Sequence, residues 1–356
     1  MRALLLAAAA LALSVGAVRA ESEMRENPFG VLEFLYWDHD WNDHQYPDEA
    51  AVRKAVRMMK EAGVGMVRID ILWQDVEPRQ GDLDYGKYDR LLDILNENGI
   101  EVLALLDYCA DWASPNGQWN TMPADHSRFL EYVTRTVERY KGKVRYWELW
   151  NEPDSPVYWQ PQDGLKAYCG LLREVYAAIK KIDPGLTVLN GGLTYELCKV
   201  NQLYDNGGKG YFDILNIHMF ETPHKPEESV RRMNAYVEAC ARIMARNGDG
   251  AKKIWVTETG CPGLKRGVRA KNWWMGENPS EKLQARMVKE TYKVLLARPE
   301  VEKVFWAFFR DTRSHWKDGT DYLGLVRNDF TAKAGYKAYK ETFEAWQAGG
   351  KERKAK

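Results

Sequence analysis

Two rhythms of apolar and polar positions take turns along this chain. Eight short runs of β-branched and apolar residues lie between turn signals such as Ala-Gly, Asn-Gly and Pro-Gly, which is typical of buried strands. These runs cover residues 30–36, 64–70, 100–107, 143–149, 186–190, 212–218, 253–258 and 302–309. Each is followed by a stretch with helical periodicity, at residues 47–61, 86–97, 122–140, 161–181, 195–206, 225–246, 279–297 and 331–347.

Eight strand–helix pairs predict a parallel sheet closed as a (β/α)8 barrel, with helices on its outside. The alternative is an open, doubly wound sheet, in which a Gly-rich turn after the first strand commonly binds a dinucleotide. The turn at residues 36–46 contains no GxGxxG, which favours the barrel. No linker, low-complexity block or repeat interrupts the series, so we expect residues 21–348 to form one domain.

The two ends of the chain differ in composition from the rest. One Arg precedes an apolar run that ends in small residues at Val18 and Ala20, which is typical of a secretory signal peptide at residues 1–20, cleaved before Glu21. A membrane anchor is the alternative, but the run is shorter than the roughly 20 residues that span a bilayer. We therefore expect a secreted or periplasmic protein. Residues 349–356, rich in Gly and Lys, predict a disordered basic tail.

The charges of the chain balance, with 51 basic and 51 acidic residues. Removal of the leader takes away Arg2 and Arg19 and leaves two more acidic than basic residues. Such a chain suits an uncharged partner better than nucleic acid or an anionic membrane. The 14 Trp, 19 Tyr and 10 Phe provide many rings that can stack on flat apolar faces, including those of sugars.

Cysteine and histidine spacing gives no sign of a metal or cofactor site. The cysteines lie far apart without a CxxC, and with an odd number at least one must be free or pair between chains. The six histidines are scattered without an HExxH, and no GxSxG elbow for acyl transfer occurs. We expect neither metal nor cofactor. The cysteines are Cys109, Cys169, Cys198, Cys240 and Cys261.

Two glutamates stand at strand ends that face each other across the predicted barrel. Glu152 follows the fourth strand in Trp-Asn-Glu-Pro-Asp, and Glu258 ends the seventh in Val-Thr-Glu-Thr-Gly. Strands four and seven lie on nearly opposite sides of the ring, so their carboxyl groups can converge over its mouth. Hydrolysis of a glycosidic bond with retention needs two such groups about 5 Å apart. The alternative is a helix cap at Glu152 and a solvated strand end at Glu258. Glu148 fits a buried partner inside the barrel better than a catalyst.

The Asn-Glu-Pro at 151–153 and the Thr-Glu-Thr-Gly at 257–260 are accompanied by further segments in a fixed order. These are Val-Arg-Ile-Asp at 67–70, Val-Glu-Pro at 76–78, Tyr-Gly-Lys-Tyr-Asp at 85–89, Asp-Trp-Ala-Ser-Pro at 111–115, Asn-Ile-His at 216–218 and Tyr-Leu-Gly-Leu-Val at 322–326. The set resembles glycoside hydrolase clan A, most of all families 39 and 5, over nearly the whole chain after the leader. The resemblance implies a retaining β-glycosidase that acts on a carbohydrate.

The resemblance also assigns roles to individual residues. It makes Glu152 the general acid/base and Glu258 the nucleophile, with Asn151 bound to the sugar hydroxyl next to the anomeric carbon. Arg68, at the end of the second strand, can hold Glu258 ionised through charge and hydrogen bonding. Glu152 must keep its proton near neutral pH, which requires a drier environment or a nearby anion.

Other proposed contacts rest on position at predicted strand ends. His218 ends strand six beside the nucleophile, where similar enzymes place a His or Tyr that bonds to it. Trp306 resembles a strand-eight aromatic that forms the floor of the first sugar subsite in related enzymes, with barrel core as its alternative. Trp112 and Trp37 fall in strand-end loops that can line a cleft.

The sequence departs from the family pattern at two positions. Phe220 stands where a Tyr often contacts the nucleophile, unless Tyr36, Tyr108 or Tyr195 takes that place. Cys261 replaces an aromatic, which could widen the pocket beside the nucleophile.

Other functions remain open at this level. A barrel that binds carbohydrate without cleaving it would use the same carboxylates as hydrogen-bond acceptors. A transglycosylase would use the same two glutamates and pass the intermediate to a sugar. The basic residues at 265, 266, 269 and 271 could admit an acidic sugar, with a solvated loop as the alternative. The sugar, linkage and oligomeric state are not predicted.

Overall fold

The computed structural model describes residues 27–35, 39–270, 279–313 and 315–354. Eight parallel strands form one sheet in the order β5-β4-β3-β2-β1-β8-β7-β6. A bridge between Leu189 and Ile214 brings β5 to β6 and closes the ring, so the predicted (β/α)8 barrel is confirmed. The strands are β1 (Phe29–Leu32), β2 (Met66–Leu72), β3 (Glu101–Asp107), β4 (Tyr146–Leu149), β5 (Thr187–Asn190), β6 (Leu215–His218), β7 (Ile254–Thr259) and β8 (Val301–Ala307).

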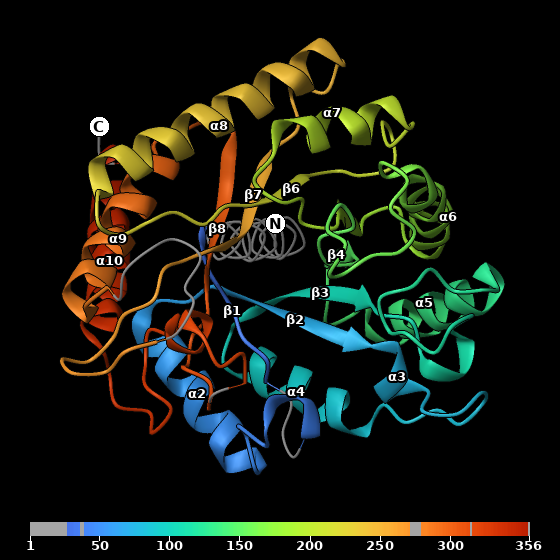
Figure 1. The fold of residues 1–356 in the computed structure, drawn as a ribbon, viewed down its shortest axis with the longest axis horizontal. Helices are drawn as coiled ribbons and strands as arrows, with labels where there is room; N and C mark the ends of the chain where they lie inside the picture. Colours follow the sequence, from blue (N-terminus) through green and yellow to red (C-terminus); the bar gives the residue numbers. More distant parts are fainter. Residues whose placement is uncertain (1–26, 36–38, 271–278, 314, 355–356) are drawn as a thin grey trace, which may run out of the picture.

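Helices surround this ring of strands (Figure 1). They are α2 (Glu49–Ala62), α3 (Trp73–Val76), α4 (Gly86–Glu97), α5 (His126–Tyr140), α6 (Lys166–Ile182), α7 (Leu197–Asp205), α8 (Pro226–Arg246), α9 (Glu281–Leu295) and α10 (Ala334–Lys354). Three 3-10 turns, η1 (Asp40–Asn42), η2 (Asp111–Ala113) and η3 (Gly319–Tyr322), lie in loops after β1, β3 and β8. Among the described helices, none has the length and apolarity that a membrane span requires.

Each predicted strand and helix has its counterpart, with bounds that shift by a few residues. The helix α3 was not predicted, because four residues are too few to show a periodicity. The last helix differs more, since α10 runs to Lys354, six residues beyond the boundary expected for the domain. The segment expected to be a disordered tail thus continues a helix, for which Lys, Glu and Arg have good propensity.

Local chemistry explains where the helices begin and end. At α2, the side chain of Asp48 accepts the backbone N–H of Ala51 at 2.8 Å and caps the first turn. Gly63 ends the same helix at φ 88°, a left-handed conformation that favours glycine. A Cβ at Gly63 would also lie 2.1 Å from the ring of Phe343 on α10. The turn therefore fixes both the end of α2 and its contact with the last helix.

The barrel interior changes from apolar to polar along its strands. One buried cluster fills its lower part and contains Met66, Leu103, Tyr146, Leu189, Ile214, Trp255 and Phe305. Side chains two residues apart on a strand point to the same face. Arg68, Glu148 and Thr257 therefore follow Met66, Tyr146 and Trp255 into the barrel, and all three are buried. This polar layer lies at the carboxyl ends of the strands, where barrel active sites form.

Candidate active site

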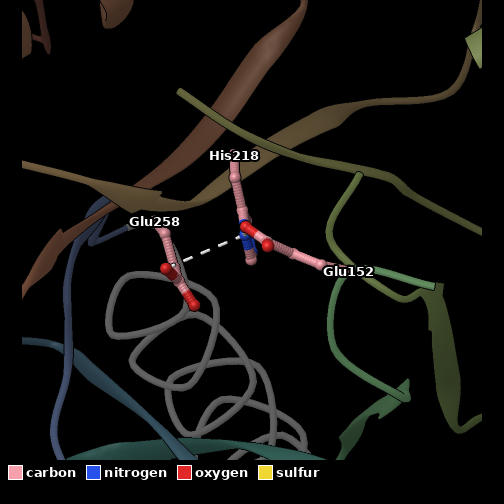
Figure 2. Close-up of side chains that lie close together, drawn as sticks. All are labelled: Glu152, His218 and Glu258. Atoms are coloured by element: carbon pink, nitrogen blue, oxygen red, sulfur yellow. Dashed lines mark hydrogen bonds and ion pairs between the residues drawn. The ribbon is translucent and has the colours of Figure 1, made fainter. Parts of the chain in front are cut away.

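Glu152, His218 and Glu258 come from the ends of β4, β6 and β7 and point toward one another (Figure 2). Nδ1 of His218 lies 2.9 Å from Oε1 of Glu152 and 3.8 Å from Oε2 of Glu258. A carboxylate oxygen of Glu152 lies within 4.8 Å of one of Glu258. The structure thus brings together the two carboxyl groups singled out from the sequence. His218 contacts Glu152 more closely than Glu258, the neighbour expected for it.

Arg68, inside the barrel, connects three of the side chains at this site. Its guanidinium donates two hydrogen bonds to Glu148, at 2.7 and 2.8 Å, one to Glu258 at 2.8 Å, and one to Oδ1 of Asn151 at 3.0 Å. Glu148 has no exposed surface and also accepts the backbone N–H of Gly192. Two buried carboxylates therefore share one buried cation, and the hydrogen bonds fix the positions of all four side chains.

Glu152 lies in an environment that favours its protonated form. Burial raises the pKa of Glu152 from 4.5 to about 8, and the nearby carboxyl of Asp154 adds to the rise while Arg68 opposes it. Asp154 is fixed next to Glu152 because the backbone N–H and hydroxyl of Thr194 bond to it. Glu152 also has a left-handed φ of 41°, a backbone conformation that costs about 1–3 kcal/mol and is common at functional sites.

Glu258 differs from Glu152 in the contacts that oppose the effect of burial on its pKa. Burial raises the pKa of Glu258, while the positive charge of Arg68 lowers it. Arg68 donates directly to Glu258, whereas no hydrogen bond links Arg68 to Glu152 among the described contacts. A shared proton therefore belongs on Glu152, and the negative charge belongs on Glu258 beside the guanidinium.

A hydrogen-bond chain orients the imidazole of His218. The hydroxyl of Thr257 donates to Oδ1 of Asn216 at 2.6 Å and lies 3.0 Å from Nε2 of His218. Because that hydroxyl proton is already used, Thr257 accepts the N–H of His218 Nε2. Burial lowers the pKa of His218 and so favours the neutral ring. Nδ1 then presents a lone pair to Glu152, which donates its proton to it when protonated.

Gly192 makes room for this imidazole. A Cβ at Gly192 would lie 2.0 Å from Nε2 of His218, so any larger residue would displace the ring. The Gly-Gly pair after the fifth strand was a visible signal of close approach that the sequence reading did not use.

The cluster of Glu152, His218 and Glu258 lines a cleft with a volume of about 800 Å³. Seven aromatic residues of the cleft form two walls. The β8–β1 wall consists of Phe34, Trp41, Phe308 and Trp316, with the rings of Phe308 and Trp316 stacked 5.1 Å apart. The β3–β4 wall consists of Tyr108, Trp119 and Tyr158, with Tyr108 and Trp119 in edge contact at 4.7 Å.

Two of the three tryptophans proposed from the sequence lie away from the cleft. Trp306 is 1% exposed, its indole N–H donates to the carbonyl of Leu323, and it does not line the cleft. Its neighbour Phe305 points into the barrel, so Trp306 points outward to the helices. Trp112 bonds to the carbonyl of Glu77 and packs on Trp73, also away from the cleft. Trp37 lies outside the described residues.

The two departures from the family pattern have different consequences. Phe220 lines the cleft, whereas Cys261 is buried in the main core and does not. Of the tyrosines considered as substitutes, Tyr36 lies outside the described residues. Tyr108 and Tyr195 both line the cleft, and the hydroxyl of Tyr195 donates to Glu221. Tyr158 also lines the cleft, although the sequence motifs did not single it out. Burial raises the pKa of Tyr158, and the charges of Glu152 and Glu258 raise it further.

The same cluster is the one place in the described chain where three side chains could share a metal ion. The ligand atoms of Glu152, His218 and Glu258 lie within 4.8 Å of one another. Arg68 already supplies a positive charge to Glu258 at 2.8 Å, which leaves less need for a cation there. The five cysteines are all free thiols.

Comparison with known proteins identifies the family of this chain. Residues 118–336 match the family described as glycosyl hydrolase catalytic core, and residues 40–107 match the family described as beta-galactosidase. The first of these matches covers more than half of the chain. The chain belongs to the glycosyl hydrolase catalytic core family. The resemblance to glycoside hydrolases that the sequence motifs indicated is thus confirmed.

Several curated β-galactosidases are similar to this glycosyl hydrolase over part of their length. β-Galactosidase LacZ of Heyndrickxia coagulans is 38% identical over 182 residues, which are 42% of this chain and 26% of that protein. β-Galactosidase BbgII of Bifidobacterium bifidum is 33% identical over 130 residues, 36% of this chain and 17% of that protein. The matches thus span about a sixth to a quarter of these larger relatives.

Solved structures share the barrel over nearly the whole chain. A family 39 glycoside hydrolase from Bacteroides cellulosilyticus WH2 has a TM-score of 0.69 at 23% identity, over 90% of this chain and 64% of that one. GH5_18 from Streptomyces cattleya, in complex with GlcNAc, has a TM-score of 0.70 at 19% identity, over 91% and 81% of the two chains. At these identities the likeness concerns the fold.

Proposed function

We propose that this glycosyl hydrolase cleaves neutral β-glycosides with retention, through a covalent intermediate on Glu258. The separation of the two carboxyl groups carries the proposal, because an oxygen of Glu152 lies within 4.8 Å of one of Glu258. Retaining glycosidases have carboxyl groups about 5–5.5 Å apart, and inverting ones need about 6.5–9.5 Å to place a water between them. The separation of the two carboxyl groups therefore supports the retaining mechanism over the inverting one.

In the first step, Glu152 protonates the glycosidic oxygen while Glu258 attacks the anomeric carbon. The C–O bond to the leaving group breaks, and a bond from the anomeric carbon to Glu258 forms. A pKa of about 8 for Glu152 keeps the required proton in place at neutral pH. Arg68 stabilises the carboxylate of Glu258 before attack.

In the second step, Glu152 accepts a proton from water as that water attacks the anomeric carbon and releases Glu258. Two inversions at one carbon give net retention. Because Oδ1 of Asn151 accepts from Arg68, its amide N–H groups face outward as donors. They can bond the hydroxyl next to the anomeric carbon, a contact that tightens in the oxocarbenium-like transition state.

The charges that line the cleft support a neutral substrate. Besides the two catalytic glutamates, the acids Asp70, Asp75, Asp111 and Glu196 line it, and Arg68 is the one Lys or Arg among the described residues that does. Arg68 is already bonded to two carboxylates, so it is poorly placed to bind a uronic acid. The basic residues at 265, 266 and 269 do not line the cleft, and Lys271 lies outside the described residues. Because the relatives above are named β-galactosidases, a β-galactoside is the first substrate to test.

Replacement of the nucleophile tests this proposal. Glu258→Ala should lose turnover of an aryl β-glycoside by several orders of magnitude, while Glu174→Ala, at a half-exposed position on α6, should keep it. Azide should restore turnover of Glu258→Ala and give the α-glycosyl azide, whereas with Glu152→Ala it should give the β-glycosyl azide. Full activity of Glu258→Ala, or an α-anomer as the first product of the unmodified enzyme by NMR, would overturn the assignment.

A further inference from the structure

A second polar group lies in the cleft away from the catalytic cluster. His39 caps the turn η1, and its Nδ1 accepts the backbone N–H of Trp41 at 3.1 Å. Its Nε2 therefore carries the proton and lies 3.1 and 3.0 Å from the two carboxylate oxygens of Asp75. The hydroxyl of Tyr88 donates to the same carboxylate at 3.2 Å, which fixes it from the other side. His39 and Asp75 are 21% and 27% exposed, and both line the cleft.

Trp41 places an accessible ring beside this pair. It is 42% exposed although it lines the cleft, and an exposed indole in a concave surface suits the flat face of a sugar. The rings of Phe34 and His315 each lie 4.7 Å from the ring of Trp41, centroid to centroid, and pack against it. A carboxylate has about four acceptor positions, so Asp75 can accept sugar hydroxyls in addition to its present bonds.

The pair lies too far along the barrel wall to serve the first sugar. Arg68, in the catalytic layer, and Leu72 are four residues apart on β2, which is roughly 13 Å along an extended strand. Asp75 follows in α3, beyond the end of that strand. The space between a sugar that reacts at Glu258 and the carboxylate of Asp75 can therefore hold a second sugar.

The positions of the two glutamates decide which side of the scissile bond this wall serves. The general acid must reach the glycosidic oxygen, so the leaving group extends past Glu152 toward the loops after β4 and β5. The part of the substrate that becomes bonded to Glu258 extends the other way, from β7 toward β8, β1 and β2. His39 and Trp41, in the loop after β1, lie on that second side, and Asp75 is joined to them through His39.

We propose that His39, Trp41 and Asp75 form a subsite for a second, neutral sugar on the glycone side of the scissile bond. Trp41 stacks on the ring, and the Asp75 carboxylate, held by His39, accepts its hydroxyls. The proposal rests on the proposed function and adds a substrate class to it, since the preferred glycone is then a disaccharide or longer. A uronic acid at this position is disfavoured because its carboxylate would face that of Asp75.

The test compares kcat/KM on 4-nitrophenyl β-monosides with that on the matching β-(1→4)-biosides of galactose, glucose, mannose and xylose. The unmodified enzyme should prefer the bioside of its best sugar. Asp75→Asn and Trp41→Ala should each lower kcat/KM on the bioside about 10- to 100-fold, the loss expected when a charged hydrogen bond or a stacking ring is removed. Both should leave the monoside within about twofold.

A matched control comes from another His–carboxylate pair. His126 and Glu174 lie 3.1 Å apart between α5 and α6, outside the cleft, so Glu174→Gln should change neither substrate. Trp41→Ala tests the subsite even if Asp75→Asn fails to fold, because Trp41 is already 42% exposed and its removal disturbs the fold little. Equal losses on both substrates, no loss on either, or a wild-type enzyme that turns over monosides as well as biosides would each overturn the subsite. Loss of both activities in Glu258→Ala reports separately on the proposed function.

Discussion

Glu152→Gln should make the folded enzyme more stable as the pH rises, relative to the unmodified enzyme. Burial raises the pKa of Glu152 from 4.5 to about 8, so the folded state keeps a proton that the unfolded chain loses. Wherever the unfolded state binds fewer protons, stability falls with rising pH. This loss begins near pH 4.5 and ends near pH 8. Gln is neutral in both states and has no such loss.

The size of the effect follows from the pKa. Between pH 4.5 and 7.5 the change amounts to about 2.6 pH units of proton linkage, or about 3.5 kcal/mol at about 1.36 kcal/mol per unit. The side chain of Glu152 is 17% exposed, and its contact with water reduces the penalty for charging it. We therefore expect Glu152→Gln to gain about 2–3 kcal/mol over the unmodified enzyme across this range.

Urea unfolding of both proteins at several pH values between 4.5 and 7.5 measures this difference, and all other titrating groups cancel in it. Glu138→Gln, at an exposed position of α5, is the matched control for the loss of a surface carboxyl group. If the stability difference of Glu152→Gln changes with pH no more than that of this control, Glu152 is not protonated in the fold at neutral pH. The argument for it as the general acid would then fail, whatever the substrate.

Four further outcomes are expected. Arg68→Met should cost about 3–5 kcal/mol by urea unfolding, because Glu148 is buried without its cation; adding Glu148→Gln should recover part of this loss, and no recovery would refute the account. The kcat/KM of the enzyme should fall above about pH 8 as Glu152 loses its proton, and a flat profile to pH 10 would contradict this. Thr257→Val should move that alkaline limb down by about one pH unit, since the imidazole proton is then free to turn toward Glu152, while Thr257→Ser should not move it. We propose that residues 1–20 are removed on export, so mass spectrometry of the mature protein should find Glu21 as its first residue, and an intact Met1 would contradict this.

The sequence was sufficient for the barrel because the barrel depends on periodicity. Eight apolar runs alternate with helical stretches, and only a parallel sheet with crossover helices buries both. The order of the strands also placed Glu152 and Glu258 at the carboxyl ends of strands that face each other across the barrel. Arg68 could be assigned to Glu258 for the same reason, because alternate residues of a strand point inward.

Aromatic residues show where sequence reasoning reached its limit. Trp306 and Phe308 lie two residues apart in the same apolar run, yet Trp306 is buried against the helices while Phe308 lines the cleft. The strand ends at Ala307, so the alternation that would place both on one face no longer applies. Trp112 and Trp41 both follow strands in short 3-10 turns, and only the packing of each loop decides that Trp41 faces the cleft.

By itself, the sequence determined the barrel and the resemblance to glycoside hydrolases, and it singled out the pair of glutamates, because these depend on residue types at regular intervals and on motifs within a few residues. The tertiary structure decided the rest. The bond between His218 and Glu152, the chain through Thr257 and Asn216, and the pairing of His39 with Asp75 join residues from different strands and loops. Distances and hydrogen-bond directions between such residues are set by how whole elements pack, and no local pattern encodes them.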